Sequence, residues 1–293
     1  MRFNFKVIGN ILGYLLMING GFMALCLPIS FYYKEDDWVA ILLSAVITLL
    51  TGLGLRFATR KRESKDLKKK DGYLIVTLGW IVMSFFGAMP YLISGEIPTL
   101  TGAFFETISG YTTTGASILT DIEGVTKGIL FWRSLTQWIG GMGIIVLALA
   151  ILPFLGIGGM QLFVAEAPGI TPDKLQPRIQ ETAKRLWYIY VGLTLFEAIL
   201  LFFAGMGPYD AVNHALTTMA TGGFSTKNAS IAHFDSPLIQ YIIIFFMFLA
   251  GTSFTLTYFA IKRNFKKIIK NEEFVVYSVF ILSITLIVTV TLL

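Results

Sequence analysis

Long apolar runs, separated by short polar segments, dominate the chain. Seven of these runs approach the length of about 20 residues that a helix needs to cross the hydrocarbon core of a bilayer. Two further runs are shorter and rich in Thr and Gly, so we expect each of them to enter the membrane and return to the same side. The predicted spans are residues 7–31, 39–55, 73–93, 129–155, 186–203, 238–261 and 274–293, and the predicted re-entrant segments are residues 98–117 and 208–225.

The composition supports this interpretation. Of the 293 residues, 55% are hydrophobic and only 14% are charged, and the mean hydropathy is +0.71. A chain of this kind is too apolar for an ordinary soluble domain. The first run is too long for a secretory signal, and no small-residue cleavage site follows it, so we expect a retained helix. The predicted fold class is therefore an all-α integral membrane protein.

The basic residues fall unevenly between the predicted spans. If the N-terminus lies in the cytoplasm, nineteen of the 23 Lys and Arg residues lie on the cytoplasmic side. Lys34, Lys127 and Lys227 then lie outside, and Arg133 lies near the outer interface. Because short cytoplasmic loops carry an excess of Lys and Arg, this topology is favoured. The net charge of +5 then requires no nucleic acid, and contact with anionic lipid is a secondary interpretation of the basic clusters.

The two re-entrant segments belong to an internal repeat. Shifting the sequence along itself by 107 residues aligns three polar or small positions of the first segment with three of the second. The aligned pairs are Glu106 with Asn213, Thr114 with Thr221, and Gly115 with Gly222.

Each repeat unit reads as helix, short helix, irregular turn and helix. We expect five parts along the chain. They are two leading helices with a basic cytoplasmic loop (1–72), a first helix–pore loop–helix unit (73–160), a cytoplasmic connector (161–184), a second unit (185–263) and the first helix of an incomplete third unit (264–293).

The turns in these units have a chemical interpretation. An irregular backbone at membrane depth must line a water-filled or ion-filled passage, because its carbonyl groups would otherwise lack hydrogen-bond partners. Carbonyl and Thr hydroxyl oxygens can replace the hydration shell of a monovalent cation. Gly115 and Gly222 give the backbone the freedom that such a turn requires. The short helices at 99–110 and 209–219 would direct their C-termini, with about half a negative charge each, toward the passage, which favours a cation.

Three further polar residues are candidates. Glu106 and Asn213 precede the turns by about two helical turns, so a supporting role behind the turn is favoured over direct contact with an ion. Glu197 lies near the middle of the fifth span, where burial of a charge is expensive. For Glu197, a hydrogen bond to another helix or to the backbone of a pore turn is favoured over ion coupling.

The sequence gives no support for catalysis. His214 and His233 are too few and too scattered for a transition-metal site. No nucleophile stands at a suitable spacing from a base, and no phosphate-binding glycine loop is present. We therefore expect neither an enzyme nor a cofactor.

Several stretches resemble the TrkH branch of the Trk/Ktr/HKT superfamily of potassium transporters, and together they cover nearly the whole chain. They are SGYTTTGAS, WRSLTQWIGGMGI, LPFLGIGGMQLFVAEAPG, ETAKRLWYIYVGLTLFEA and HALTTMATGGFSTKNASIAHFDSP. The resemblance implies a multi-pass protein of the bacterial inner membrane that takes up K⁺. It also implies four helix–pore loop–helix units around a pseudo-fourfold axis, a homodimer, and a cytoplasmic nucleotide-binding partner of the TrkA type. The positions matching the K⁺-binding filter are Thr113, Thr114, Gly115, Ala116, Ala220, Thr221, Gly222 and Gly223.

The chain departs from this pattern in length, since it holds two complete units and one helix of a third. We therefore expect the N-terminal portion of a four-unit potassium transporter. The alternative is a non-conducting relic or an assembly module that associates with full-length relatives. Symport with H⁺ or Na⁺ stays open on the sequence.

Overall fold

The computed structural model describes residues 3–60, 69–141, 143 and 178–292. In these ranges every regular element is a helix, which confirms the predicted all-α fold. Five stretches of the described chain are long and apolar enough to cross a membrane, namely Phe5–Tyr33, Trp38–Ala58, Asp71–Ser94, Lys184–Phe203 and Glu272–Leu292. They correspond to the first, second, third, fifth and seventh predicted spans.

The leading helices form a closely packed pair. The first span consists of α1 (Phe5–Ala24) and α2 (Leu27–Tyr33), and the second is α3 (Trp38–Ala58). A Cβ atom on Gly13 would lie 2.8 Å from the Gly52 carbonyl oxygen, and one on Gly52 would lie 2.7 Å from that of Gly13. Glycine at both positions therefore lets the backbones of α1 and α3 approach, as small residues do in membrane helices.

The next elements follow the pattern of a span, a short helix, a turn and a span. They are α4 (Lys69–Gly87), α5 (Met89–Ser94), α6 (Leu100–Tyr111) and α7 (Lys127–Gly141). The third predicted span is divided between α4 and α5 just before Pro90, whose ring and missing N–H disfavour a continuous helix. The fourth predicted span starts within α7, and its residues 144–155 lie outside the described part.

The same pattern recurs after the connector, most of which lies outside the described residues. The helices are α10 (Arg178–Phe203), α11 (Pro208–Met219), a short 3₁₀ helix (Ser230–His233), α12 (Pro237–Ala250) and α13 (Phe254–Ile261). Helix α10 starts before the predicted span at 186, so the last residues of the predicted connector are helical.

The prediction that the sixth span is one continuous helix is wrong. The span breaks between Ala250 and Phe254 into α12 and α13. At the break a Cβ atom on Gly251 would lie 2.2 Å from the Tyr277 hydroxyl, so the close approach of a later helix requires glycine there. The chain then continues through α14 (Phe265–Ile269) into α15 (Glu272–Leu292), the seventh predicted span.

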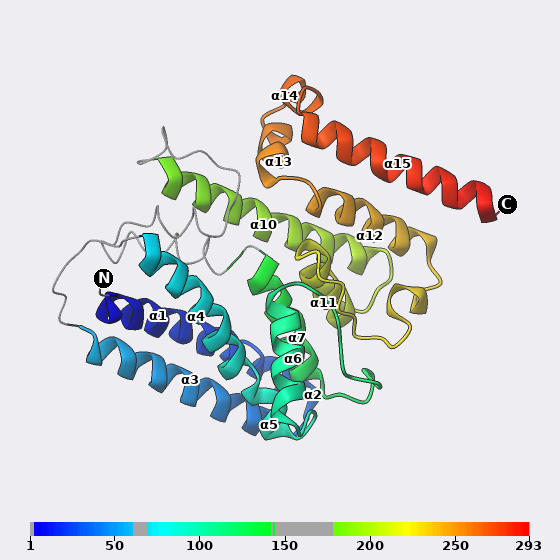
Figure 1. Ribbon diagram of the computed structural model, residues 1–293. Coiled ribbons are helices and arrows are strands. Elements are labelled where there is room, and N and C mark those ends of the chain that lie inside the picture. Colours follow the sequence, from blue (N-terminus) through cyan, green and yellow to red (C-terminus); the bar gives the residue numbers. More distant parts are fainter. Residues whose placement is uncertain (1–2, 61–68, 142, 144–177, 293) are drawn as a thin grey trace.

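Figure 1 shows how these helices are arranged. The short helices α6 and α11 lie at the centre together with α7, which packs against both of them. Helices α1, α3 and α4 lie on one side of this group, and α10 and α12 lie on the other. Helix α15 lies at the edge and buries none of its side chains. The fold therefore brings the C-terminal ends of both short helices into its interior.

Candidate functional site

The first turn begins where α6 ends. The chain leaves Tyr111 and passes through two residues with positive φ, Thr113 (+53°) and Gly115 (+76°). The Thr114 N–H donates to the Ser109 carbonyl at 2.9 Å. This bond closes a Schellman motif with a threonine at the left-handed position, where glycine is usual. A β-branched residue is strained in that region, and such strain concentrates at functional sites.

The second turn has the same construction at the end of α11. Thr221 (+55°) and Gly223 (+78°) have positive φ, and the Gly222 N–H donates to the Thr217 carbonyl at 2.9 Å. A threonine again holds the left-handed position of a Schellman motif. Two segments far apart in sequence thus form turns with closely similar backbone angles.

The structure corrects the repeat offset from 107 to 108 residues. The bounds of α6 and α11, the strained threonines and the positive-φ glycines all match at 108. The shorter offset aligned the two Thr-Gly dipeptides, but the second turn carries an additional glycine. The counterpart of Gly115 is therefore Gly223, and the counterpart of Glu106 is His214 rather than Asn213.

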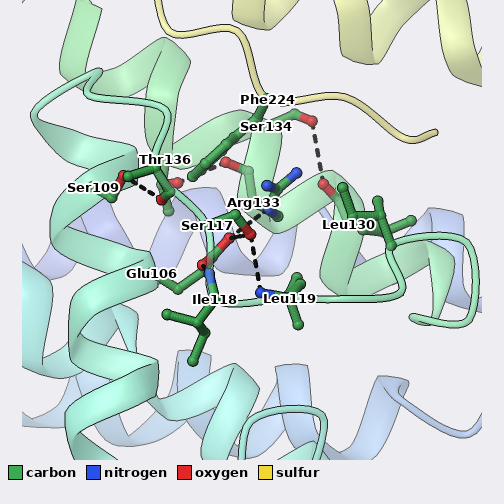
Figure 2. A network of polar contacts seen from close by, with 12 residues as sticks. Glu106, Ser109, Ser117, Ile118, Leu119, Leu130, Arg133, Ser134, Thr136 and Phe224 are labelled. Atoms are coloured by element: carbon green, nitrogen blue, oxygen red, sulfur yellow. Dashed lines mark hydrogen bonds and ion pairs between the residues drawn. The ribbon is translucent and has the colours of Figure 1, made fainter. Parts of the chain in front are cut away.

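Glu106 is fully buried and contacts the chain that follows the first turn. Its carboxylate accepts hydrogen bonds from the Ser117 hydroxyl at 2.8 Å and from the Ile118 N–H at 2.9 Å. Figure 2 shows these contacts, with Arg133 reaching the same carboxylate from α7. The Glu106 carboxylate, a charged acceptor, thus attaches the first turn to the helix that precedes it.

His214 makes the equivalent contact in the second turn. Its Nε2 lies 3.0 Å from the hydroxyl of Ser225, which stands 108 residues after Ser117. Its Nδ1 lies 2.8 Å from the Asp210 carbonyl oxygen, which can only accept a hydrogen bond. Nδ1 is therefore the protonated nitrogen, and Nε2 of the neutral ring accepts from Ser225. A neutral acceptor replaces the carboxylate of the first turn.

Of the predicted candidates, Asn213 lies within the second short helix and Glu197 lies beside it. The Asn213 side chain donates to the Tyr209 carbonyl of its own helix at 2.8 Å. Glu197 is fully buried on α10, where its carboxyl approaches Thr218 of α11. Neither of its oxygens has a hydrogen-bond partner among the residues that the structure describes. The coupling role considered for Glu197 stays a prediction.

The two turns touch each other. A Cβ atom on Gly115 would lie 2.1 Å from the Gly222 carbonyl oxygen, so glycine is required for this approach. A Cβ atom on Gly222 would in turn lie 2.3 Å from the side chain of Gln137 on α7. The oxygen of Gln137 accepts from the Phe224 N–H at 3.0 Å. The predicted filter segments therefore meet at one place, with α7 behind the second.

The remaining predicted filter residues flank this contact. The Ala116 carbonyl accepts from the Ser109 hydroxyl at 2.6 Å, and Ala220 is the buried C-cap residue of α11. The Thr114 hydroxyl lies 2.8 Å from that of Thr112 and is exposed at the turn. The Thr221 hydroxyl donates to the Ala220 carbonyl at 2.7 Å.

A cavity of about 290 Å³ lies beside the second turn. Its polar lining includes Thr217, Thr218 and Thr221, and its apolar lining includes Ile243 and Met247 of α12. Gly222 and Gly223 also border it. The second turn therefore faces open space rich in threonine on one side and the first turn on the other.

Sequence reasoning missed the role of α7. The expected position of Arg133 near the outer interface stays a prediction, but its contacts were not foreseen: only 2% of the residue is exposed, and its Nε lies 2.7 Å from the Glu106 carboxylate. Gln137, one helical turn later, was not a candidate at all. A charged residue within a predicted apolar span is expensive and commonly functional, and this signal would have identified Arg133.

Comparisons with known proteins identify one family. A family profile described as TrkH, cation transport protein, matches residues 39–293. The Trk system potassium uptake protein TrkH of Escherichia coli K12 is 45% identical over 275 residues, which are 92% of this chain and 56% of that protein. The Trk system potassium uptake protein TrkG of the same organism is 35% identical over 271 residues, with the same coverage of 92% and 56%.

A solved structure is also similar. The crystal structure of the potassium transporter TrkH from Vibrio parahaemolyticus superimposes with a TM-score of 0.78 at 40% sequence identity. The match covers 92% of this chain and 55% of that one. The chain thus spans about half the length of the relatives that it matches.

Proposed function

The chain belongs to the TrkH family of cation transport proteins, and on this premise we propose that it forms part of a potassium uptake protein whose two turns hold the ion. The family is one of transport proteins rather than enzymes. Its members in Escherichia coli are named potassium uptake proteins. The ion is cargo in this proposal and not a resident cofactor.

The observation that carries the proposal is the contact between Gly115 and the Gly222 carbonyl. Two turns of equal geometry meet there, each at the C-terminus of a short helix. The negative ends of both helix dipoles are therefore close to the same point, which favours a cation. Backbone and hydroxyl oxygens can then replace the water around a dehydrated K⁺.

We assign the ion-facing role to four residues of each turn. Threonines at the left-handed positions cost conformational energy that a purely structural turn would avoid with glycine. Their strain, at the same step of both turns, supports a functional role. The ion-facing residues of this proposal are Thr113, Thr114, Gly115 and Ala116 in the first turn and Ala220, Thr221, Gly222 and Gly223 in the second.

The proposal extends to the surroundings of the protein. The apolar spans make the chain a multi-pass membrane protein, and the distribution of Lys and Arg supports a cytoplasmic N-terminus in a bacterial inner membrane. A homodimer and a cytoplasmic nucleotide-binding partner of the TrkA type complete the proposal. Co-purification from detergent-solubilised membranes tests both, and a monomer without such a partner would contradict them.

The test of function is rubidium uptake by cells that lack other potassium uptake and express the protein at its full natural length. We expect the Gly115→Ala variant to lose at least about tenfold in uptake. The added methyl group would overlap the Gly222 carbonyl, and alanine with positive φ costs about 1–2 kcal/mol.

The matched control is Gly95→Ala. Gly95 also has a positive φ (+81°), but no atom lies within 4 Å of a Cβ placed there. Both variants therefore carry backbone strain, and only Gly115→Ala disturbs the contact between the turns. Equal uptake by the two variants, at equal amounts in the membrane, would remove the turns from the ion pathway.

A further inference from the structure

Arg133 is a buried cation on the helix that lies between the two turns. Its side chain is 3% exposed and its acidic partner, Glu106, is fully buried. Burying two charges is costly, and a buried pair of this kind adds little stability compared with apolar residues of similar size. In a membrane protein an ionised pair in the interior therefore suggests a function other than stability.

One end of the pair is attached to the first turn. Glu106 accepts from Arg133 Nε at 2.7 Å and, at the same time, from the Ser117 hydroxyl and the Ile118 N–H. Ser117 lies two residues beyond Gly115. A shift of the Arg133 guanidinium would therefore be transmitted through one carboxylate to the exit of the first turn (Figure 2).

The other end of Arg133 is attached to the second turn. A terminal nitrogen of its guanidinium donates to the Ser225 carbonyl at 3.0 Å. The guanidinium carbon also lies 3.6 Å from the centroid of the Phe224 ring, within the range of a cation–π contact. Ser225 lies two residues beyond Gly223, as Ser117 does beyond Gly115. One planar side chain thus binds the second turn directly and the first turn through the Glu106 carboxylate.

Gln137 completes the attachment of the second turn to α7. It lies one helical turn beyond Arg133, accepts from the Phe224 N–H, and fills the space that a side chain at Gly222 would occupy. The second turn is therefore fixed to α7 at two adjacent points. The first turn is fixed to the same helix through Glu106.

We propose that Arg133 is a positioning residue that sets the distance between the two turns and thereby the preference of the site for K⁺ over Na⁺. The proposal rests on the potassium uptake function proposed above. Binding geometries of this kind must hold within about 0.5 Å. A rigid guanidinium bonded to the second turn and to the carboxylate that holds the first can enforce such a distance, whereas a lysine ammonium is a point charge on a flexible stem and cannot span both contacts.

The experiment compares rubidium and sodium uptake by the full-length protein and its Arg133→Lys variant. We expect the rubidium-to-sodium uptake ratio of the variant to fall by about tenfold, the scale of one lost hydrogen bond to a charged group. Sodium uptake should rise while rubidium uptake persists. The matched control is Arg56→Lys, because Arg56 stacks on Tyr14 in the leading helices, away from both turns.

The outcomes separate the two proposals. A folded Arg133→Lys protein with an unchanged ratio overturns the positioning role while leaving the uptake function intact. Equal loss of both ions, with a lowered unfolding temperature, also overturns it, because a merely structural role predicts that result. A wild-type protein without selective uptake would instead contradict the function itself.

A second variant tests the positioning role of Arg133 if Arg133→Lys does not accumulate in the membrane. Phe224→Leu removes the ring under the guanidinium but keeps an apolar side chain and leaves the ion pair with Glu106 in place. We expect a smaller fall of the same ratio. No change in the ratio for a folded Phe224→Leu protein would overturn the proposal.

Discussion

Thr113 and Thr221 hold backbone conformations that glycine would adopt at less cost. Each stands at the left-handed position of a Schellman motif, where most helices place glycine. The next positive-φ residue in each turn is a glycine, so only the threonine position of each turn carries backbone strain. A threonine at this step supplies a hydroxyl that glycine lacks, and on the proposal that the turns hold the ion this hydroxyl is the reason for retaining the strain.

Replacing Thr113 by glycine tests this argument. We expect the unfolding temperature of Thr113→Gly to stay the same or rise, because relief of about 1–2 kcal/mol of strain is offset by the larger entropy of glycine in the unfolded chain. Rubidium uptake should nevertheless fall, because the hydroxyl is lost. Thermal unfolding of the purified protein and uptake in cells measure the two effects.

Lys34→Gly is the control for Thr113→Gly. Lys34 also has a positive φ (+56°) at the C-terminal end of a helix, but it lies away from the turns. The two variants should behave alike in thermal unfolding and differ in uptake. Full uptake by Thr113→Gly would show that the strained threonine has no part in ion binding.

At the scale of elements, α7 is the helix on which both turns depend. A Cβ atom on Gly140 would lie 1.9 Å from the Tyr111 carbonyl oxygen, at the end of α6. Gly141 lies against Ala220 at the end of α11, where a Cβ atom would approach its backbone to 2.7 Å. The two adjacent glycines therefore place one backbone against the ends of both short helices.

This packing predicts a large effect of one methyl group. Gly140→Ala should destabilise the protein by about 1–3 kcal/mol, the usual cost of overpacking, because a backbone carbonyl cannot move aside like a flexible side chain. Thermal unfolding in detergent measures the change. Gly192→Ala on α10 is the control, since no atom lies within 4 Å of a Cβ there and alanine favours a helix by about 1 kcal/mol. A Gly140→Ala protein as stable as Gly192→Ala would contradict the packing argument.

The sequence predicted these elements better than their contacts. Apolar run length located five of the seven predicted spans, because the thickness of the bilayer sets the length of a helix that crosses it. Both short helices lie within the shorter Thr- and Gly-rich runs. Run length did not predict the break between Ala250 and Phe254 within the sixth predicted span. The repeat offset was also wrong, because matching Thr-Gly dipeptides outweighed the backbone geometry that decides equivalence. The contacts of Arg133 and Gln137 were not predicted, because their partners come from other elements.

At the scale of the whole molecule, the leading helices support the site although they lie outside the repeat. The Tyr111 hydroxyl, at the end of α6, donates to the Asn19 side chain of α1 at 2.6 Å. Asn19 also donates to the Met83 carbonyl of α4 at 3.4 Å. The first turn is thus connected to the first span of the chain as well as to α7.

The loops after the two turns are joined in a similar way through Asn228. Its side-chain oxygen accepts from the Ile122 N–H at 2.7 Å, and its amide nitrogen donates to the Asp121 carboxylate at 3.0 Å. Its own N–H donates to Glu123 at 3.1 Å. One residue of the second loop therefore holds three successive residues of the first. Together with Arg133, this contact joins the two repeat units of the described chain.

Asn228→Ala should release the first loop without unfolding the helices. We expect amide exchange in residues 118–126 to become roughly tenfold faster, the scale of one or two ordinary hydrogen bonds. Hydrogen–deuterium exchange with mass spectrometry measures it. Asn264→Ala is the control, because the Asn264 side chain makes no capping hydrogen bond at the start of its helix.

Acid should have the same effect as Asn228→Ala on the wild-type loop. The pKa of Asp121 lies below its ordinary value, because the Asn228 amide and the Gly124 N–H donate to its carboxylate. A carboxyl group whose pKa is lowered by folding stabilises the fold above its unfolded pKa of about 4, and this contribution is lost as the pH falls through the lowered pKa. Protection of the loop, corrected for intrinsic exchange, should therefore be constant near neutrality and fall in strong acid. In Asn228→Ala the loss of loop protection on acidification should be smaller than in the wild type. An equal loss in both proteins would show that Asp121 does not act through Asn228.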